Sequence, residues 1–102
     1  MVTIIFRLKI KDGKEAEALA EIEKMGSAVE ANEPETLAYV FHQLQDDPMQ
    51  LVLFESYTDD EALQAHVKTP HFAAFRASTA DAFDTSEIQV ERLDRIAGVV
   101  RG

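Results

Sequence analysis

The chain has 102 residues, of which 46% are hydrophobic, and it carries 19 acidic residues against 10 lysines and arginines. This length suits one domain with one modest core, so we expect a single domain over residues 1–102. The net charge of -9 disfavours nucleic acid and anionic membranes as partners. No cysteine is present, which excludes disulfides, thiolate catalysis and cysteine-ligated metals.

The N-terminal segment alternates apolar and other side chains and lacks the apolar block of a signal peptide. No apolar run is long enough to cross a bilayer. A chain without cysteine also suits a reducing compartment. We therefore expect a cytoplasmic protein.

The first two predicted elements are a strand and a helix. Residues Val2–Ile10 alternate with a period of two, which is typical of a strand. Apolar residues recur at helical spacing over about 14–32, so this segment should form a helix, with Asp12 placed to cap it.

Two strands are expected next, over 36–45 and 50–57. In the first of them, Leu37, Tyr39 and Phe41 should share one face. Both strands are apolar on both faces, so both faces should be covered. One layer of helices covers only one face, and a second copy of the chain is the simplest cover for the other.

The second half predicts a helical corner and a last strand. Thr58 and Glu61 have capping-box spacing and should start a short helix. A Thr-Pro step breaks it, and a longer helix should run from Pro70 to about residue 82. The last strand is expected over 87–94, followed by an apolar tail over 96–102 that is a candidate contact with a partner subunit.

This order is β-α-β-β-α-β, the ferredoxin-like split βαβ pattern of the α+β class. Its antiparallel sheet should carry both helical segments on one face. The other face should be apolar, and two such faces packed together would form a dimeric α+β barrel.

Chemistry-bearing residues gather near the helical corner. Glu55 is a carboxylate on an apolar strand. One interpretation is that it is a hydrogen-bond partner for a histidine or a ligand. The alternative is that it lies at the edge of the sheet and reaches solvent or pairs with an arginine. His66 lies near the buried stripe of the short helix and is a candidate general base or a hydrogen-bonded structural histidine. On one straight helix His71 would point about 140° away from His66, and packing or fixing the helix end is its favoured role.

Other chemistries lack support. His42, His66 and His71 have no tight ligand spacing, so we expect no metal. No glycine-rich phosphate loop and no Gly-x-Ser-x-Gly motif is present, so neither a nucleotide cofactor nor an acyl-transfer triad is expected. Phe72, Phe75 and Phe83 are interpreted chiefly as core residues.

One segment resembles a known family. The residues Glu55-Ser56-Tyr57, Ala62-Leu63-x-Ala65-His66 and Thr69-Pro70-His71-Phe72 are similar to those of the antibiotic biosynthesis monooxygenase family, small proteins of the dimeric α+β barrel class. A weaker resemblance extends over nearly the whole chain.

The resemblance implies a homodimer with a small pocket between sheet and helices in each subunit. It implies oxidation of a small quinol, phenol or polyketide-like aromatic by O2, without metal, flavin or haem. His66 would be the leading proton-handling residue and Glu55 its polar companion. The candidate pocket walls and substrate contacts are Tyr39, Phe41, Tyr57, His71, Phe72 and Phe75.

The chain also departs from parts of the family. Haem-degrading relatives carry Asn, Trp and His where this chain has Phe6, His66 and Arg76, so haem breakdown is not expected. Aromatic-polyketide oxidisers often use Trp, which is absent here. Two alternatives remain open: a non-catalytic dimer that binds a small ligand, and an acid–base isomerase using Glu55 and His66.

Overall fold

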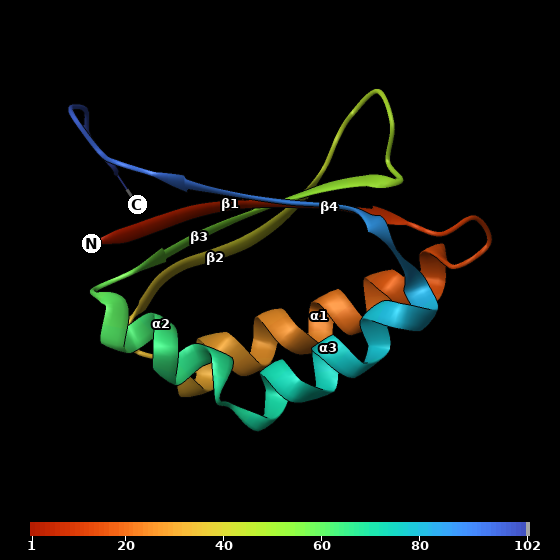
Figure 1. The fold of residues 1–102 in the computed structure, drawn as a ribbon, viewed down its shortest axis with the longest axis horizontal. Helices are drawn as coiled ribbons and strands as arrows, with labels where there is room; N and C mark the ends of the chain where they lie inside the picture. The colour runs from red at the N-terminus through yellow and green to blue at the C-terminus, as the bar shows by residue number, and fades with distance from the viewer. Residues whose placement is uncertain (102) are drawn as a thin grey trace.

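Four antiparallel strands form a sheet in the order β2-β3-β1-β4, and three helices lie against one of its faces (Figure 1). The computed structural model describes residues 1–101. Its elements are β1 (Val2–Ile10), α1 (Glu15–Asn32), β2 (Thr36–Gln43), β3 (Gln50–Tyr57), α2 (Asp60–Val67), α3 (Pro70–Ala82) and β4 (Phe83–Leu93). The predicted ferredoxin-like α+β fold is confirmed.

Two of the three predicted helix caps differ from prediction. α1 begins without a side-chain cap, so the prediction for Asp12 was wrong. The side chain of Glu15 instead accepts a hydrogen bond from the backbone N–H of Gly13, at 3.0 Å. α2 is capped by Asp59, whose carboxylate accepts from the N–H of Ala62 at 2.8 Å, and not by Thr58.

The third cap is as predicted and creates the corner between α2 and α3. The hydroxyl of Thr69 accepts a hydrogen bond from the N–H of Phe72 at 3.1 Å, and Pro70 occupies the first turn of α3. A proline there fits because its missing N–H would have no partner inside the helix. The corner therefore ends α2 and starts α3 in a new direction (Figure 1).

β2 contains an irregularity that periodicity did not predict. The pairing of β2 with β3 shifts between Thr36 and Ala38, so Leu37 is an extra residue in the ladder. Leu37 is exposed, whereas Tyr39 and Phe41 face the helices. The three residues therefore do not share one face, because a bulge interrupts the alternation.

β4 begins four residues earlier than predicted. Phe83, which was interpreted as a core residue, is the first residue of the strand and is fully buried. Its ring centroid lies 5.8 Å from that of Phe75 on α3. The main core cluster gathers around it, with Leu8, Ile10, Ala18, Leu51 and Ala82. Phe83 thus joins the last helix to the sheet.

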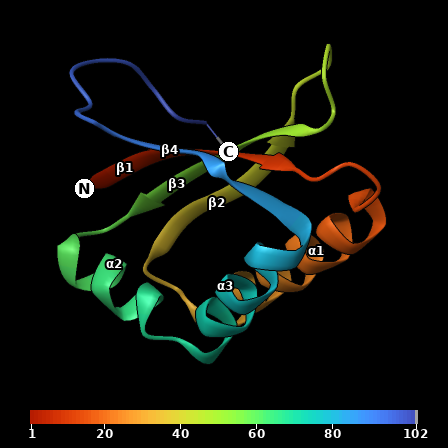
Figure 2. The ribbon, with the colours of Figure 1, turned by 45° about the vertical axis from the view of Figure 1, so that its right-hand side comes forward.

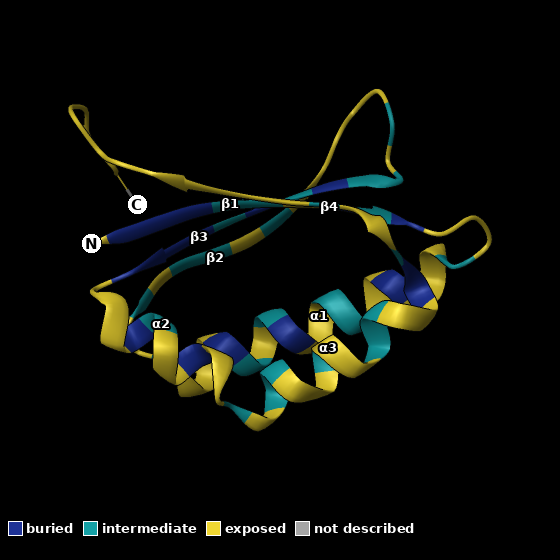
Figure 3. Cartoon of the chain, in the orientation of Figure 1, coloured by how far each residue is buried: buried dark blue, intermediate teal, exposed yellow. Residues whose placement is uncertain are grey.

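The helices leave the opposite face of the sheet uncovered (Figure 2). The register aligns Ile5, Phe54 and Val40 in one row across three strands of this face, and Val40 is 47% exposed. Beyond β4, the segment 94–101 is exposed throughout (Figure 3), and Ile96 is 95% exposed. Within the described residues, no helix combines the length and apolar character that crossing a membrane requires.

Candidate functional site

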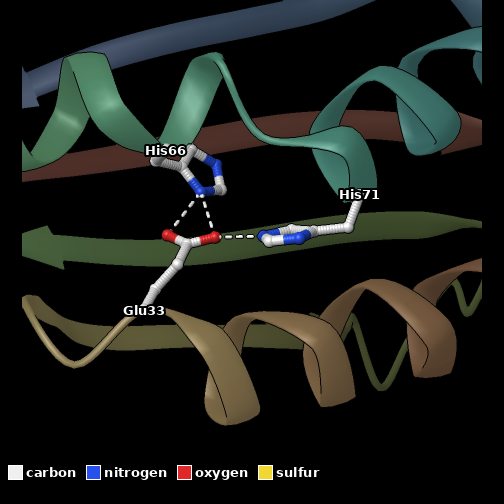
Figure 4. A group of neighbouring side chains, drawn as sticks. All are labelled: Glu33, His66 and His71. Carbon is white, nitrogen blue, oxygen red and sulfur yellow. Dashed lines mark hydrogen bonds and ion pairs between the residues drawn. The ribbon is translucent and has the colours of Figure 1, made fainter.

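Three helix ends bring a carboxylate and two imidazoles together (Figure 4). Glu33 caps the C-terminus of α1, His66 lies in the last turn of α2 and His71 in the first turn of α3. The break at Thr69 allows both histidines to point at one carboxylate. We call Glu33, His66 and His71 the histidine–glutamate cluster.

The cluster is closely hydrogen-bonded. His66 Nδ1 lies 2.8 Å from Glu33 Oε1 and 3.0 Å from Oε2, and His71 Nε2 is hydrogen-bonded to Oε2. The hydroxyl of Thr36 donates to Oε1 at 2.7 Å. The side chains of Glu33 and His66 are only 8% and 2% exposed. Three donors thus hold a largely buried carboxylate.

These contacts determine the protonation of the cluster. Burial alone would raise the pKa of Glu33, but hydrogen bonds from His71, Thr36 and His66 outweigh it and keep that pKa below its usual value. An ionised carboxylate only accepts, so both facing ring nitrogens carry protons. Burial lowers the pKa of His66 and favours its neutral form. A neutral His66 with its proton on Nδ1 has a free electron pair on Nε2.

A largely apolar cavity of ≈480 Å³ lies between the sheet and the helices α2 and α3, and His66 lines it. Aromatic side chains from strands and helices share the lining, namely Tyr39, Phe41, Phe72 and Phe75. The rings of Tyr39 and Phe72 lie 5.1 Å and 5.3 Å from the imidazole of His66. Arg76 contributes a cation to the same lining.

Glu55 is, with His66, one of two buried polar side chains that line the cavity. It accepts a 2.5 Å hydrogen bond from the hydroxyl of Tyr57, and it is buried within the sheet. Burial raises its pKa, with a smaller contribution from the charge of Glu33, although the bond from Tyr57 opposes the shift. Burial likewise raises the pKa values of Tyr39 and Tyr57. Glu55 therefore favours its protonated form more than an exposed glutamate does.

The structure arranges the predicted site residues in a different pairing from the one we expected. Among the described residues, no hydrogen bond joins Glu55 to His66. Glu55 is paired with Tyr57, two residues along the same face, and His66 is paired with Glu33. Both nevertheless line the same cavity.

Two predicted wall residues lie elsewhere. Tyr57 is fully buried and is not among the side chains that line the cavity, because its hydroxyl is directed at Glu55. His71 is likewise absent from the lining and is bound to Glu33. His42 lies on β2 with its Nδ1 3.2 Å from the carbonyl oxygen of Val52, and it has no contact with the cluster.

Glu33 is the site residue that the sequence analysis missed. It directly follows the segment 14–32 that was predicted to be a helix, and the sequence analysis gave it no role. One signal was available: a carboxylate at a helix C-terminus faces the negative end of the helix dipole, so its position there requires donors from elsewhere. The cluster is also the one group of three or more potential metal ligands within residues 1–101.

The comparisons with known proteins agree with this fold. The model of the family "Antibiotic biosynthesis monooxygenase" matches residues 1–78. No curated protein gives a significant match. A candidate antibiotic biosynthesis monooxygenase of Caulobacter crescentus is similar in structure, with 25% identity, a TM-score of 0.86, and coverage of 94% of this chain and 90% of that one.

Two further solved structures are similar. A Pseudomonas aeruginosa protein shares 25% identity at a TM-score of 0.83, over 94% of each chain. A structure described as an antibiotic biosynthesis monooxygenase shares 25% identity at a TM-score of 0.85, over 95% of this chain and all of that one. Because the family model covers more than half of the sequence, this chain belongs to the antibiotic biosynthesis monooxygenase family.

Proposed function

We propose that this protein binds a small quinol or phenol, including polyketide-like aromatics, in the ≈480 Å³ cavity and oxidises it with O2 without a cofactor. The observation that carries the proposal is the state of His66. One ring nitrogen is held by an ionised carboxylate, and the ring lines an apolar cavity walled by aromatic side chains.

The volume and lining of the cavity suit such a substrate. Small-molecule sites are mostly apolar, enclose roughly 300–1,000 Å³ and contain a few placed polar groups. Tyr39, Phe41, Phe72 and Phe75 offer faces and edges for an aromatic ring. The lining side chains that can carry a charge at neutral pH are those of His66, Glu55 and Arg76.

In the proposed reaction His66 Nε2 accepts the phenolic proton. Glu33 supports this step because its negative charge stabilises the imidazolium that forms, as a carboxylate does behind many catalytic histidines. The resulting phenolate is electron-rich and reduces O2 itself: O2 adds to a ring carbon as a hydroperoxide, and loss of water together with the hydrogen of that carbon leaves a carbonyl group. The substrate thus supplies all four electrons, one oxygen atom enters the quinone product and the other leaves as water. The apolar walls exclude water from the reactive intermediates.

Glu55 is proposed as the second proton-handling group. Its raised pKa favours a proton on the carboxyl, and its position in the cavity lining lets that proton reach reduced oxygen. The charge of Arg76 favours the anionic form of the substrate. The remaining predicted contacts, Tyr57 and His71, act through Glu55 and Glu33 and not on the substrate.

We further propose that the working unit is a homodimer closed over the open face of the sheet. The row of Ile5, Phe54 and Val40 on that face is the supporting observation, because monomers rarely leave such a row in water. The exposed apolar tail beyond β4 is a second candidate contact. Light scattering coupled to size exclusion should give a dimer mass, and Phe54→Asp should give a monomer; a monomeric wild type would contradict this.

The reaction is tested by O2 consumption with a panel of hydroquinones and naphthols. Wild type should consume O2 above the buffer background with at least one substrate, and His66→Ala should be slower by roughly 10²–10⁴-fold, the usual contribution of a general base. His42→Ala is the matched control and should keep full activity once light scattering shows that it keeps the mass of wild type, because His42 lies on the open face of the sheet and is bonded to the carbonyl of Val52, away from the cluster. Equal activity of His66→Ala and wild type would refute the proposed base.

An acid–base isomerase is the second candidate, favoured because His66 and Glu55 face one cavity with opposite protonation preferences. It predicts deuterium from solvent in the product and no O2 uptake. A simple binding dimer predicts a ligand that raises the melting temperature and is recovered unchanged.

A further inference from the structure

We propose that the histidine–glutamate cluster is a binding site for one divalent transition-metal ion of the zinc or iron(II) class. The ligands would be His66 Nδ1, His71 Nε2 and a carboxylate oxygen of Glu33. Two imidazoles and one carboxylate form the ligand set of many zinc sites and of non-haem iron sites. The site itself does not depend on the proposed reaction.

The spacing of the three ligand atoms suits one ion. They all lie within 4.8 Å of one another, and His66 Nδ1 is 2.8 Å and 3.0 Å from the two oxygens of Glu33. In a tetrahedral site with metal–ligand bonds of about 2.0–2.1 Å, two ligand atoms lie about 3.4 Å apart. The two nitrogens therefore need to approach one another by up to about 1.4 Å.

The chemistry of the ligands also suits a cation. An ionised carboxylate offers a full negative charge, and neutral imidazoles each offer one electron pair. Binding at Nδ1 of His66 and Nε2 of His71 requires only that the proton of each ring move to its other nitrogen. The preference for nitrogen ligands selects zinc or iron(II) over magnesium or calcium, which prefer oxygen.

Access to the cluster exists from a second hollow. A cavity of ≈170 Å³ between α1 and α3 is lined by His71, by the charged side chains of Glu21 and Lys24, and by the apolar residues Met25, Ala28, Ala74 and Phe75. His71 is also the most exposed cluster side chain, at 15%, against 2% for His66. An ion can enter past His71, and water there can complete its coordination.

Metal binding would change what His66 presents to the large cavity. A metal on Nδ1 leaves the ring proton on Nε2, so His66 becomes a hydrogen-bond donor where the metal-free protein has an acceptor. If the proposed oxidation is correct, the metal-bound form is therefore inactive. Metal and substrate proton would then compete for the single free electron pair of the neutral ring.

The site is tested without substrate, so its failure and the failure of the proposed reaction are distinguishable. Protein without a histidine tag is titrated with Co²⁺, which is followed by visible absorption, and with Zn²⁺, which is followed by melting temperature. We expect one ion per chain, a melting temperature that rises with Zn²⁺, and binding weakened by more than about tenfold in Glu33→Gln and His71→Ala. His42→Ala should bind as wild type does.

A spectroscopic measurement on wild type covers the case in which a variant fails to fold. In nitrogen-15 spectra of the imidazoles, Zn²⁺ should shift the signals of His66 and His71 and leave those of His42 unchanged. Binding of similar strength in all variants would assign the ion to the acidic surface of the protein and overturn the site. Shifts confined to His42 would place the ion near that residue and would also overturn the site. Absence of binding at millimolar Zn²⁺ would also overturn it.

Discussion

Two largely buried carboxylates, Glu33 and Glu55, have opposite properties, and their surroundings explain the difference. Glu33 receives three hydrogen bonds at the junction of helix ends, and its pKa falls. Glu55 receives one hydrogen bond within an apolar sheet, and its pKa rises. Burial acts on both in the same direction, so the number of donors decides whether the pKa of each carboxyl falls or rises.

Among changes to the two carboxylates and their partners, the largest effect should come from removing the charge of Glu33. Glu33→Gln keeps the shape and the oxygen that Thr36 contacts but no longer stabilises an imidazolium at His66. We expect kcat for quinol oxidation to fall by about 10–100-fold, the usual cost of losing a group that orients a functional histidine. Steady-state O2 uptake measures it. An unchanged kcat would mean that Glu33 only supports the fold.

Next in size is the loss of the single donor to Glu55. Tyr57→Phe removes the hydroxyl that bonds to Glu55 and leaves a buried acceptor without its partner. We expect the free energy of unfolding to fall by about 1–3 kcal/mol. Urea denaturation at pH 7 measures the change. A loss below 0.5 kcal/mol (about the error of the method) would show that water replaces the hydroxyl.

A smaller effect is expected at the corner that holds the cluster. Thr69→Ala removes the hydroxyl that accepts from the N–H of Phe72. The free energy of unfolding should fall by about 1 kcal/mol, as for other N-cap losses. Thr69→Ser keeps the hydroxyl and is the matched control. Equal losses in both variants would show that the methyl group of Thr69 matters and the cap does not.

The smallest effect is a difference in pH dependence. The folded-state pKa of Glu55 is raised above its ordinary value of 4.5, so its contribution to stability is present below pH 4.5 and is lost as pH rises through the folded pKa. Relative to Glu55→Gln, wild type should therefore lose stability as pH rises above 4.5. Denaturation midpoints between pH 4 and pH 8 measure it, and parallel profiles would contradict the raised pKa.

The opposite sign is expected for Glu33. Its folded-state pKa is lowered, so its contribution is present above pH 4.5 and is lost as pH falls through the folded pKa. Glu33→Gln should not show this loss of stability as the pH falls. The stability of wild type is compared with that of Glu55→Gln and with that of Glu33→Gln as pH changes. If both differences change in the same direction, the contrast between the two carboxylates is contradicted.

The sequence predicted the fold well because its signals are local. The alternation in β1, the apolar character of both faces of β3 and the Thr-Pro step at the corner each depend on a few neighbouring residues, and the structure contains all three elements. Leu37 was misplaced because a bulge depends on how two strands pair and not on the alternation of one. Asp59 and Thr58 were confused because adjacent residues can both accept from the first turn of a helix.

The site was predicted in part for the same reason. Glu55 and Tyr57 are two residues apart on one strand, so their shared face followed from periodicity. The bonds of Glu33 to His66 and His71 span 33 and 38 residues, and they depend on how α1 packs against α3. No spacing rule along the chain describes that packing. The partner of His66 therefore required the three-dimensional structure.

The corner at Thr69 and Pro70 has a consequence for how relatives should be compared. Both histidines would survive if this step were replaced by residues that continue the helix, but an unbroken helix would splay them to different sides. A sequence comparison that considers only the two histidines would then treat such a relative as having the same site as this protein. Transfer of function between family members should therefore require four positions: the acid that ends the first helix, the two histidines, and the break between them.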